Sequence, residues 1–335
     1  MQPFSYVEPR SRAEALRLAQ AYPEARFLAG GTTLVDLMKS GVVHPPMLID
    51  VNRIGGLDEI EAAEGSLRLG ALARMSDAAS HEAVRTQAPG LSESLLFAAS
   101  GQLRNMASLG GNLLQRTRCL YFRDRHFPCN KRAPGSGCGA IDGENRALAV
   151  LGTSAACIAN YPGDFAIMLV ALDGTVYLDG PAGERAVPAA TFHRLPADTP
   201  HIETVLAPGE MITAISLPLG ALSRQSRYLK VRDRSSYEYA SVSVAAAADF
   251  APDGTIRDAR LALGGLAAKP WPVTEAALLL AGRRPDDPVA MGRLMDAAVD
   301  GARPRSGNAY KVPQARSAIR RAFATLARRS ARSVA

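Results

Sequence analysis

The sequence predicts an α+β protein of about two domains. Its 335 residues suit two domains of ordinary size. Strand-like and helical segments are mixed over the first two thirds of the chain, whereas the last third has two neighbouring strand-like segments followed by three helical ones. Hydrophobic residues make up 47% of the chain and charged residues 21%, which excludes a disordered or collagen-like protein. No apolar run reaches the ~20 residues of a transmembrane helix.

The first fifty residues contain a strand, a glycine turn, a helix and a second strand. The predicted elements are a helix over residues 11–22, a strand over 26–29, a helix over 34–39 and a strand over 47–51. Thr32 or Thr33 is the expected N-cap of the second helix. Together with Gly30 and Gly31 they present backbone N–H groups at a helix N-terminus, which suits a phosphate group.

The remaining elements follow the same reasoning from periodicity and turn residues. We expect strands over residues 67–71, 175–178, 203–206 and 211–217, helices over 75–81 and 91–99, and a renewed apolar segment over 164–172. A domain boundary is expected near residues 219–227. Beyond it we expect antiparallel strands over 241–248 and 258–264, joined by a Pro-Asp-Gly turn, and helices over 273–282, 289–301 and 313–332.

A second glycine turn lies at residues 108–113, with the sequence Ser-Leu-Gly-Gly-Asn-Leu. Each of the two glycine turns could cradle a pyrophosphate, although a Gly-Gly pair is more often only a structural turn. Neither turn fits the P-loop or the Rossmann glycine pattern, so these two nucleotide-binding classes are disfavoured.

Four cysteines, Cys119, Cys129, Cys138 and Cys157, lie within 39 residues, and the rest of the chain has none. No C-x-x-C pair occurs, which disfavours a zinc ribbon or a thioredoxin-type site. The surrounding segment is rich in arginine, proline and glycine and has few apolar residues, so it needs an internal staple. From the residues alone an iron–sulfur cluster, a zinc site and two disulfides all stay open.

The C-terminal 35 residues carry nine of the 39 basic residues and no acidic residue, and the rest of the chain has a formal charge of −2. Nucleic-acid binding is one interpretation of this basic tail, but no recognition motif accompanies it. A solvated helix face or contact with an acidic partner is the simpler interpretation. The five histidines are scattered and none accompanies a nucleophile, so we expect no catalytic residue in this chain.

Several long stretches of the sequence are distinctive. They are LAGGTTLVDLMKSGVVHPPMLIDVN (28–52), SGQLRN (100–105), ASLGGNL (107–113), GGNLLQRTRC (110–119), PCNKRAPGSGC (128–138), TPHIET (199–204), KVRDRSSYEYA (230–240) and ALGGLAAKPW (262–271). With these stretches the chain resembles the FAD-binding subunits of the xanthine dehydrogenase family of molybdenum hydroxylases. The resemblance is sharpest for the FAD and iron–sulfur subunit of bacterial periplasmic aldehyde oxidoreductases, and it runs from the first strand to Pro313.

The resemblance implies a fold and a division of the chain. It implies a two-part FAD-binding domain of the PCMH (vanillyl-alcohol-oxidase-like) type over residues 1–220. A smaller C-terminal domain of antiparallel sheet and helices, like that of the carbon monoxide dehydrogenase flavoprotein, is implied over 224–330. The family's second glycine turn runs almost directly into a helix start, which Pro162-Gly163-Asp164-Phe165 resembles here. Residues 115–159 are therefore an insertion.

The resemblance also implies the cofactor-binding residues. A first wall would wrap the FAD pyrophosphate, a second wall would face it, and three single residues would contact the ribityl or ribose, the flavin region and the isoalloxazine. The first wall is Leu28, Ala29, Gly30, Gly31, Thr32, Thr33 and Leu34; the second is Ser108, Gly110, Gly111, Asn112 and Leu113; the single residues are Asp164, Ile212 and Lys230. Two departures from the family pattern are Gly163 in place of serine and the lack of a stacking phenylalanine near Ala98.

Within the resemblance the insertion binds a [4Fe–4S] cluster, as does a related insertion in the flavin subunit of 4-hydroxybenzoyl-CoA reductase. This assigns Cys119, Cys129, Cys138 and Cys157 as the four ligands. Ordinary core packing for Ile212 and a surface ion pair for Lys230 remain the alternative interpretations of those two residues.

The implied function is electron transfer in a heterotrimeric aldehyde oxidoreductase. A large molybdenum-cofactor subunit would oxidise an aldehyde to a carboxylic acid, a small subunit with two [2Fe–2S] clusters would pass the electrons on, and FAD in this chain would deliver them to an acceptor. The alternatives are a free-standing flavin oxidase and a zinc-stapled assembly subunit without a redox role. The N-terminal segment lacks an export signal, so we expect a periplasmic location only by co-export with a signal-bearing partner, and otherwise a cytoplasmic one.

Overall fold

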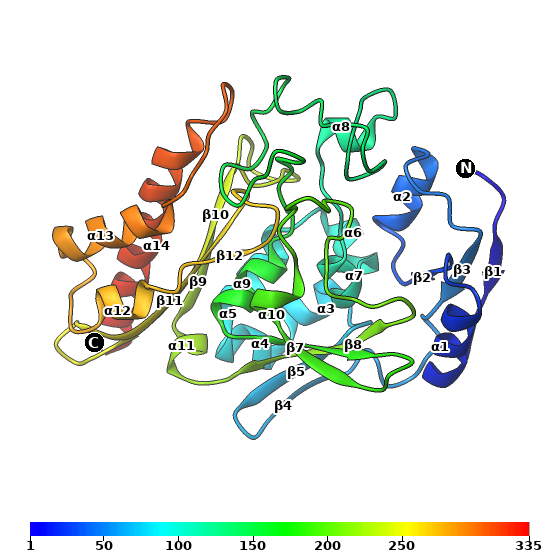
Figure 1. Ribbon diagram of the computed structural model, residues 1–335. Helices are drawn as coiled ribbons and strands as arrows, with labels where there is room; N and C mark the ends of the chain where they lie inside the picture. Colours follow the sequence, from blue (N-terminus) through cyan, green and yellow to red (C-terminus); the bar gives the residue numbers. More distant parts are fainter. Residues whose placement is uncertain (335) are drawn as a thin grey trace.

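The computed structural model describes residues 1–334, and within them the strands form three sheets (Figure 1). The first sheet is parallel and has three strands in the order β1-β3-β2. The second has five antiparallel strands in the order β4-β5-β8-β6-β7, and the third has four in the order β12-β11-β10-β9. This mixture of helices with separate parallel and antiparallel sheets confirms the predicted α+β class.

The small N-terminal sheet carries the first glycine turn. Its elements are β1 (Ser5–Val7), α1 (Arg12–Ala21), β2 (Arg26–Leu28), α2 (Leu34–Lys39) and β3 (Met47–Asp50). The Ser11 side chain caps α1 by accepting a hydrogen bond from the Glu14 N–H at 3.2 Å. The buried faces of Ala15 and Ile49 hold α1 against the sheet. Thr33 occupies the N-cap position of α2, but its side chain makes no capping bond, so the predicted threonine cap is wrong in that respect.

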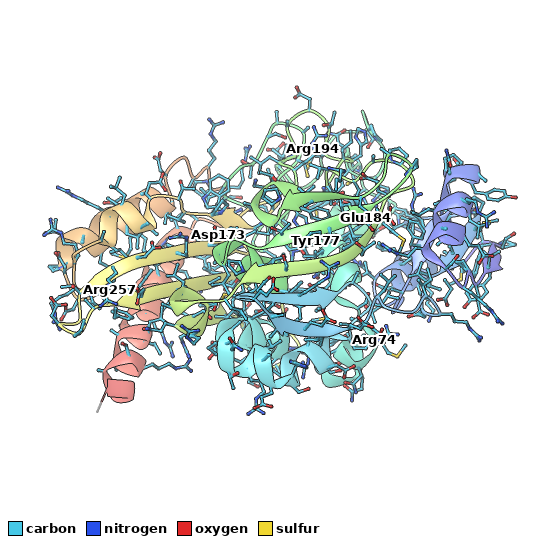
Figure 2. The ribbon with its side chains drawn as sticks, turned by 90° about the horizontal axis from the view of Figure 1, so that it is seen from below. Arg74, Asp173, Tyr177, Glu184, Arg194 and Arg257 are labelled. Carbon is cyan, nitrogen blue, oxygen red and sulfur yellow. The ribbon has the colours of Figure 1, made fainter. Side chains whose placement is uncertain are left out.

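The five-stranded sheet lies in the N-terminal two thirds of the chain. Its strands are β4 (Ile60–Ala63), β5 (Ser66–Gly70), β6 (Thr175–Asp179), β7 (Arg185–Pro188) and β8 (Met211–Pro218). Strand β8 pairs with β5 on one side and β6 on the other, so it joins chain segments that are far apart in sequence. Figure 2 shows this sheet from below, with Tyr177 of β6 near its middle.

A layer of short helices covers one face of this sheet. The helices are α3 (Met75–Ser80), α4 (Glu82–Gln87), α5 (Pro89–Phe97), α6 (Gly101–Met106), α7 (Leu109–Leu113), α9 (Phe165–Ala171) and α10 (Ala189–Phe192). All seven residues of α9 are buried, which places this helix in the centre of the molecule (Figure 1). The second glycine turn is thus part of a short helix, α7.

The C-terminal part is a sheet with helices packed on its outer face. Its elements are α11 (Ala221–Arg224), β9 (Ser226–Val231), β10 (Val242–Phe250), β11 (Ile256–Gly264), β12 (Trp271–Pro272), α12 (Ala276–Leu280), α13 (Pro288–Ala298) and α14 (Lys311–Val334). Alternate residues of β10 face opposite cores: Ala245 and Ala247 face the core of the N-terminal part, and Val244 and Ala246 face the outer helices. Small side chains therefore let both layers approach this strand.

The insertion at residues 115–159 contains one short helix, α8 (Leu120–Arg123), and is otherwise irregular. It lies at the top of the molecule in Figure 1. Its buried residues share a small core with Leu37 and Val42, so it packs against α2 and the loop that follows.

One predicted strand is absent from the structure, and the strands β1, β4, β7, β9 and β12 were not predicted. Residues 203–206 form no strand; Thr204 makes only an isolated bridge with His193, because the Glu203 side chain is directed into an ion-pair network. Strand β9 was not expected, since residues 219–227 were interpreted as a boundary. None of the described helices is long and apolar enough to cross a membrane.

Candidate functional site

A deep cavity lies between the N-terminal sheet, the helix layer and strand β8. Most of the residues predicted to bind a cofactor line it, although they come from four separate parts of the chain. Those lining residues are Leu28, Ala29, Gly30, Gly31, Thr32, Thr33, Leu34, Ser108, Gly110, Gly111, Asn112, Asp164 and Ile212. Leu113 and Lys230 do not line the cavity and lie behind its wall.

The first wall offers backbone N–H groups. Within the described chain, the N–H groups of Gly30, Gly31, Thr32 and Thr33 donate no hydrogen bond to another protein group. Gly31 has φ +70°, a left-handed conformation that favours glycine and turns the chain into α2. A row of unpaired N–H donors at the start of a helix can hold the oxygens of a pyrophosphate.

The second wall uses its N–H groups internally. Leu109 and Gly110 donate to the carbonyls of Ala73 and Ala71 at 3.0 and 2.8 Å, and Gly111 donates to the Ser108 hydroxyl at 3.2 Å. A Cβ at Gly110 would lie 3.0 Å from the Ala71 Cβ, so glycine allows this close approach. The second wall therefore supplies shape and space, and the first wall supplies the donors.

The two walls touch at Gly30. A Cβ added there would lie 1.9 Å from the carbonyl oxygen of Met106, which precedes the second wall. The segment over Ala98 and Ala99 also lines the cavity, and the small side chain of Ala98 stands where the resemblance leads one to expect a phenylalanine. The neighbouring Phe97 is partly exposed.

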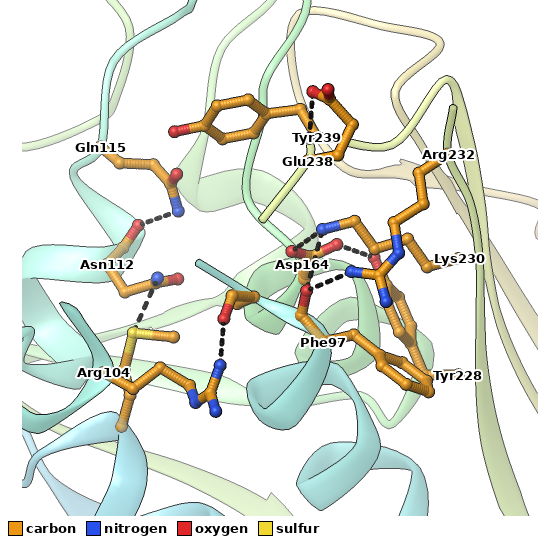
Figure 3. A network of polar contacts seen from close by, with 12 residues as sticks. Phe97, Arg104, Asn112, Gln115, Asp164, Tyr228, Lys230, Arg232, Glu238 and Tyr239 are labelled. Carbon is orange, nitrogen blue, oxygen red and sulfur yellow. Dashed lines mark hydrogen bonds and ion pairs between the residues drawn. The ribbon is translucent and has the colours of Figure 1, made fainter. Parts of the chain in front are cut away.

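A buried polar network lies beside the cavity (Figure 3). One oxygen of Asp164 accepts from the Tyr228 hydroxyl at 2.7 Å and the other accepts from the Lys230 ammonium at 2.8 Å. Lys230 also donates to the carbonyl of Phe97 at 3.1 Å. Burial and the Asp164 charge together raise the pKa of Tyr228 well above its ordinary value, so its hydroxyl stays a donor. Lys230 is thus held through Asp164, one layer behind the cavity surface.

His193 supports the second wall from below. Its Nε2 lies 2.8 Å from the Leu113 carbonyl, and in the described structure its buried Nδ1 has no partner. Burial lowers the pKa of His193 to about 4, against a smaller opposite effect of the hydrogen bond. The neutral ring therefore donates from Nε2 to Leu113.

The four cysteines converge in the insertion, and all four are free. Cys119, Cys129 and Cys157 are buried in one small core, against which Cys138 packs, and Cys129 and Cys138 face each other in an antiparallel bridge. Burial raises the pKa of Cys119 to about 12, although the N–H groups of Phe122 and Tyr121 lower it. Such thiols ionise when a bound metal compensates the charge.

The described residues contain no group of three or more histidine, cysteine, aspartate or glutamate side chains arranged to hold a single metal ion. A cubane cluster is larger than one ion and binds each cysteine through a different iron atom. The donor set of four thiols in one desolvated core fits such a group.

Basic side chains surround the insertion, and the nearby carboxylates each pair with two of them. Asp36 of α2 accepts from both Arg118, at 3.2 Å, and Arg123. Glu203 accepts from Arg116 at 2.5 Å and from Lys131 at 2.9 Å. Burial raises the pKa of Cys157, and the positive charge of Lys131 opposes this effect. The insertion therefore holds more positive than negative charge around its thiols.

The cysteine core and the cavity are neighbours along the chain. Arg118 lines the cavity and directly precedes Cys119, and its guanidinium lies 5.1 Å from the ring centre of Tyr239, which also lines the cavity. Sequence reasoning missed Tyr239 and Gln115 as lining residues. Tyr239 lies in a stretch already singled out by the resemblance, and Gln115 directly precedes the arginine-rich part of the insertion.

Comparison with known proteins agrees with this geometry. The family described as "FAD binding domain in molybdopterin dehydrogenase" matches residues 2–220, and "CO dehydrogenase flavoprotein C-terminal domain" matches residues 227–326. The chain therefore belongs to the FAD-binding subunits of the molybdenum hydroxylase family.

Individual relatives indicate which type of molybdenum hydroxylase this subunit resembles. The chain is 51% identical to the aldehyde oxidoreductase FAD-binding subunit PaoB of Escherichia coli, over 82% of this chain and 85% of PaoB. It is 26% identical to the glyceraldehyde dehydrogenase medium chain of Sulfolobus acidocaldarius, over 85% of this chain and 83% of that one. A reconstituted CO dehydrogenase from Oligotropha carboxidovorans has a chain with a TM-score of 0.77 and 25% identity, covering 98% and 100% of the two chains. This chain is a medium, FAD-binding subunit of the aldehyde oxidoreductase type.

We predict that Gly30→Ala weakens FAD binding about tenfold, because relief of the clash with Met106 costs ~1–3 kcal/mol at the wall. Flavin fluorescence titration of the apoprotein measures the effect. Gly55→Ala is the matched control, since a Cβ at Gly55 meets nothing within 4 Å. Equal affinities of the two variants for FAD would contradict a site at this wall.

The buried His193 predicts a pH dependence of stability. Its folded pKa, about 4, lies below the ordinary 6.5, so the unfolded chain binds more protons between these values. The contribution of His193 to folding stability is therefore complete above pH 6.5 and is lost as the pH falls toward 4, by about 3 kcal/mol in all. Chemical denaturation of the wild type and His193→Gln at pH 7 and pH 4.5 tests this. Equal losses of folding stability in the wild type and in His193→Gln would rule out this contribution of His193.

Proposed function

We propose that this chain is the FAD and [4Fe–4S] electron-transfer subunit of a molybdenum-containing enzyme that oxidises an aldehyde to a carboxylic acid. Its partners would be a large subunit with the molybdenum cofactor and a small subunit with two [2Fe–2S] clusters. When bound, FAD supplies the conversion of one-electron transfers into a two-electron discharge to an external acceptor. The main support for an aldehyde as the substrate is the 51% identity to an aldehyde oxidoreductase subunit.

The observation that carries this proposal is that a cavity lined by both glycine turns adjoins a core of four thiols. The free N–H groups of residues 30–33 would hold the pyrophosphate, and the glycines of the second wall would let the cofactor lie close to the chain. Ile212 of β8 would contact the flavin region. Asp164 would face the ribityl or ribose, and Lys230 behind it would hold the Asp164 carboxylate in position.

The four cysteines would each bind one iron of the cluster. All four are free, three are buried with the fourth packed against them, and cations are in excess around them. A cluster bound by four thiolates is anionic, so this surplus of positive charge would stabilise it. The sequence left open a zinc-stapled insertion without a redox role; the described residues contain no group arranged to hold a single ion, which favours the cluster, and metal analysis below distinguishes the two.

Location is a further part of the proposal. The complex would reach the periplasm with a signal-bearing partner subunit, which fractionation of cells that express all subunits would test.

We predict about four iron, four acid-labile sulfide and one FAD per chain for protein purified without air with its partners. Cys119→Ser and Cys138→Ser should lose most of the iron and the brown absorbance but keep FAD, because the glycine walls lie outside the thiol core. His126→Ala is the control within the insertion: its side chain is 94% exposed, and it should keep the iron. FAD with zinc in place of iron would exclude the cluster.

The basic tail predicts a docking contact. Arg316 and Arg329 are paired with Asp296 and Glu93, whereas Arg320 and Arg321 are exposed on α14. We expect Arg320→Glu with Arg321→Glu to reduce co-purification of the partner subunits several-fold, because the change reverses the charge of the contact.

The matched control places the same charge reversal on exposed arginines of α1 and α4, Arg17→Glu with Arg85→Glu. Quantitative co-purification from cells that express all subunits compares the pairs. Unchanged assembly of the Arg320 and Arg321 double variant would show that α14 is only a solvated basic face.

A further inference from the structure

Lys131 is the one lysine of the insertion, and burial of its charge costs folding free energy. Its side chain is 7% exposed, and its ammonium donates to Glu203 Oε1 at 2.9 Å and to the Pro200 carbonyl at 2.8 Å. Burial of a charge is unfavourable unless it is paired and hydrogen-bonded. An apolar residue at this position would avoid that cost, so the charge itself requires an explanation.

The partner carboxylate belongs to the FAD-binding domain outside the insertion. Burial raises the pKa of Glu203, but the charges of Arg116 and Lys131 outweigh this and keep the pKa below its ordinary value, so Glu203 is ionised. Three side chains thus form one partly buried network with two positive charges and one negative charge. The network joins the start and the middle of the insertion to residues 200–204.

Lys131 also lies close to the thiols. It follows Cys129 by two residues, and the intervening Asn130 donates to the Ala156 carbonyl at 3.0 Å and accepts from Gly137 at 2.8 Å. These bonds bind the Cys129 strand to the segments that carry Cys157 and Cys138. The hydrogen bonds to Pro200 and Glu203 fix the Lys131 ammonium, so a positive charge is held on the chain two residues from Cys129.

We propose that Lys131 and Glu203 form a partly buried charge pair that positions the insertion and sets the reduction potential of the cluster it holds. This inference rests on the proposed [4Fe–4S] cluster. One-electron reduction adds one negative charge at the thiol core, and a fixed nearby cation stabilises the reduced form. Lys131 therefore raises the potential, and the opposite charge of Glu203 limits that rise. Both are positioning residues and bind no iron.

The test is a redox titration of the air-free complex, followed by electron paramagnetic resonance of the reduced cluster, with iron measured in every variant. Lys131→Met should lower the equilibrium constant for reduction on the order of tenfold, which corresponds to about 59 mV for one electron. Glu203→Gln should shift the potential in the opposite direction, because it leaves Arg116 and Lys131 uncompensated. Lys131→Arg should restore a value near that of the wild type.

Lys269→Met is the matched control. This half-buried lysine also donates to a backbone carbonyl, that of Ala190 at 2.9 Å, but in the described structure it makes no hydrogen bond or ion pair with the insertion, and its loss should leave the potential unchanged. Shifts of Lys131→Met and Glu203→Gln in the same direction would show structural loosening and overturn the charge assignment. If Lys131→Met fails to retain iron, the Glu203→Gln variant tests the charge assignment instead. A rise of its reduction potential would support the assignment, and a fall would overturn it.

The outcomes also separate this inference from the function on which it rests. Wild-type protein without iron would overturn the proposed cluster and this inference with it. Wild-type and variant proteins with full iron and equal potentials would overturn the role of Lys131 alone.

Discussion

The close backbone approach at Gly30 sets the shape of the cofactor site. Gly30 belongs to the small N-terminal sheet, and the Met106 carbonyl that it faces belongs to the helix layer over the large sheet. Any side chain at Gly30 would separate these two units. Because the units meet there, the unpaired N–H groups of residues 30–33 face the glycines of α7 across one cavity. The binding surface is thus made by backbone, and side chains serve mainly to hold the two backbones in place.

Strand β10 extends this arrangement into the C-terminal sheet. Its small residues allow α9 to pack closely against the sheet, and a Cβ at Gly264 of the paired β11 would meet Ile167 of α9 at 2.8 Å. Asp164, at the start of α9, is thereby brought to Tyr228 and Lys230 of β9. A charged pair can be buried there because both carboxylate oxygens are satisfied. The C-terminal sheet accordingly contributes to the cavity from behind, through Asp164.

Local patterns in the sequence predicted most elements correctly, because helical and strand periodicity depends on neighbouring residues. The first glycine turn was also predictable, since its N–H donors precede a helix. From the residues alone the second turn could be a phosphate cradle or only a structural turn; its N–H groups are in fact consumed by Ala71, Ala73 and Ser108, contacts that no local pattern reveals. Residues 203–206 were predicted as a strand, yet Glu203 is held by Arg116 and Lys131, 87 and 72 residues away. Such long-range pairing overrides local propensity.

The charge distribution of the insertion links its folding to what it binds. Two carboxylates, Asp36 and Glu203, each serve two cations, and the buried Nε of Arg118 and Nη1 of Arg123 have no partner in the described structure. Four protonated thiols do not balance this positive charge, whereas four metal-bound thiolates do. The segment has one short helix and a small core, so burial alone contributes little to its stability. Metal binding would supply the missing negative charge and the staple together, and its free energy would then be part of the folding free energy of the insertion.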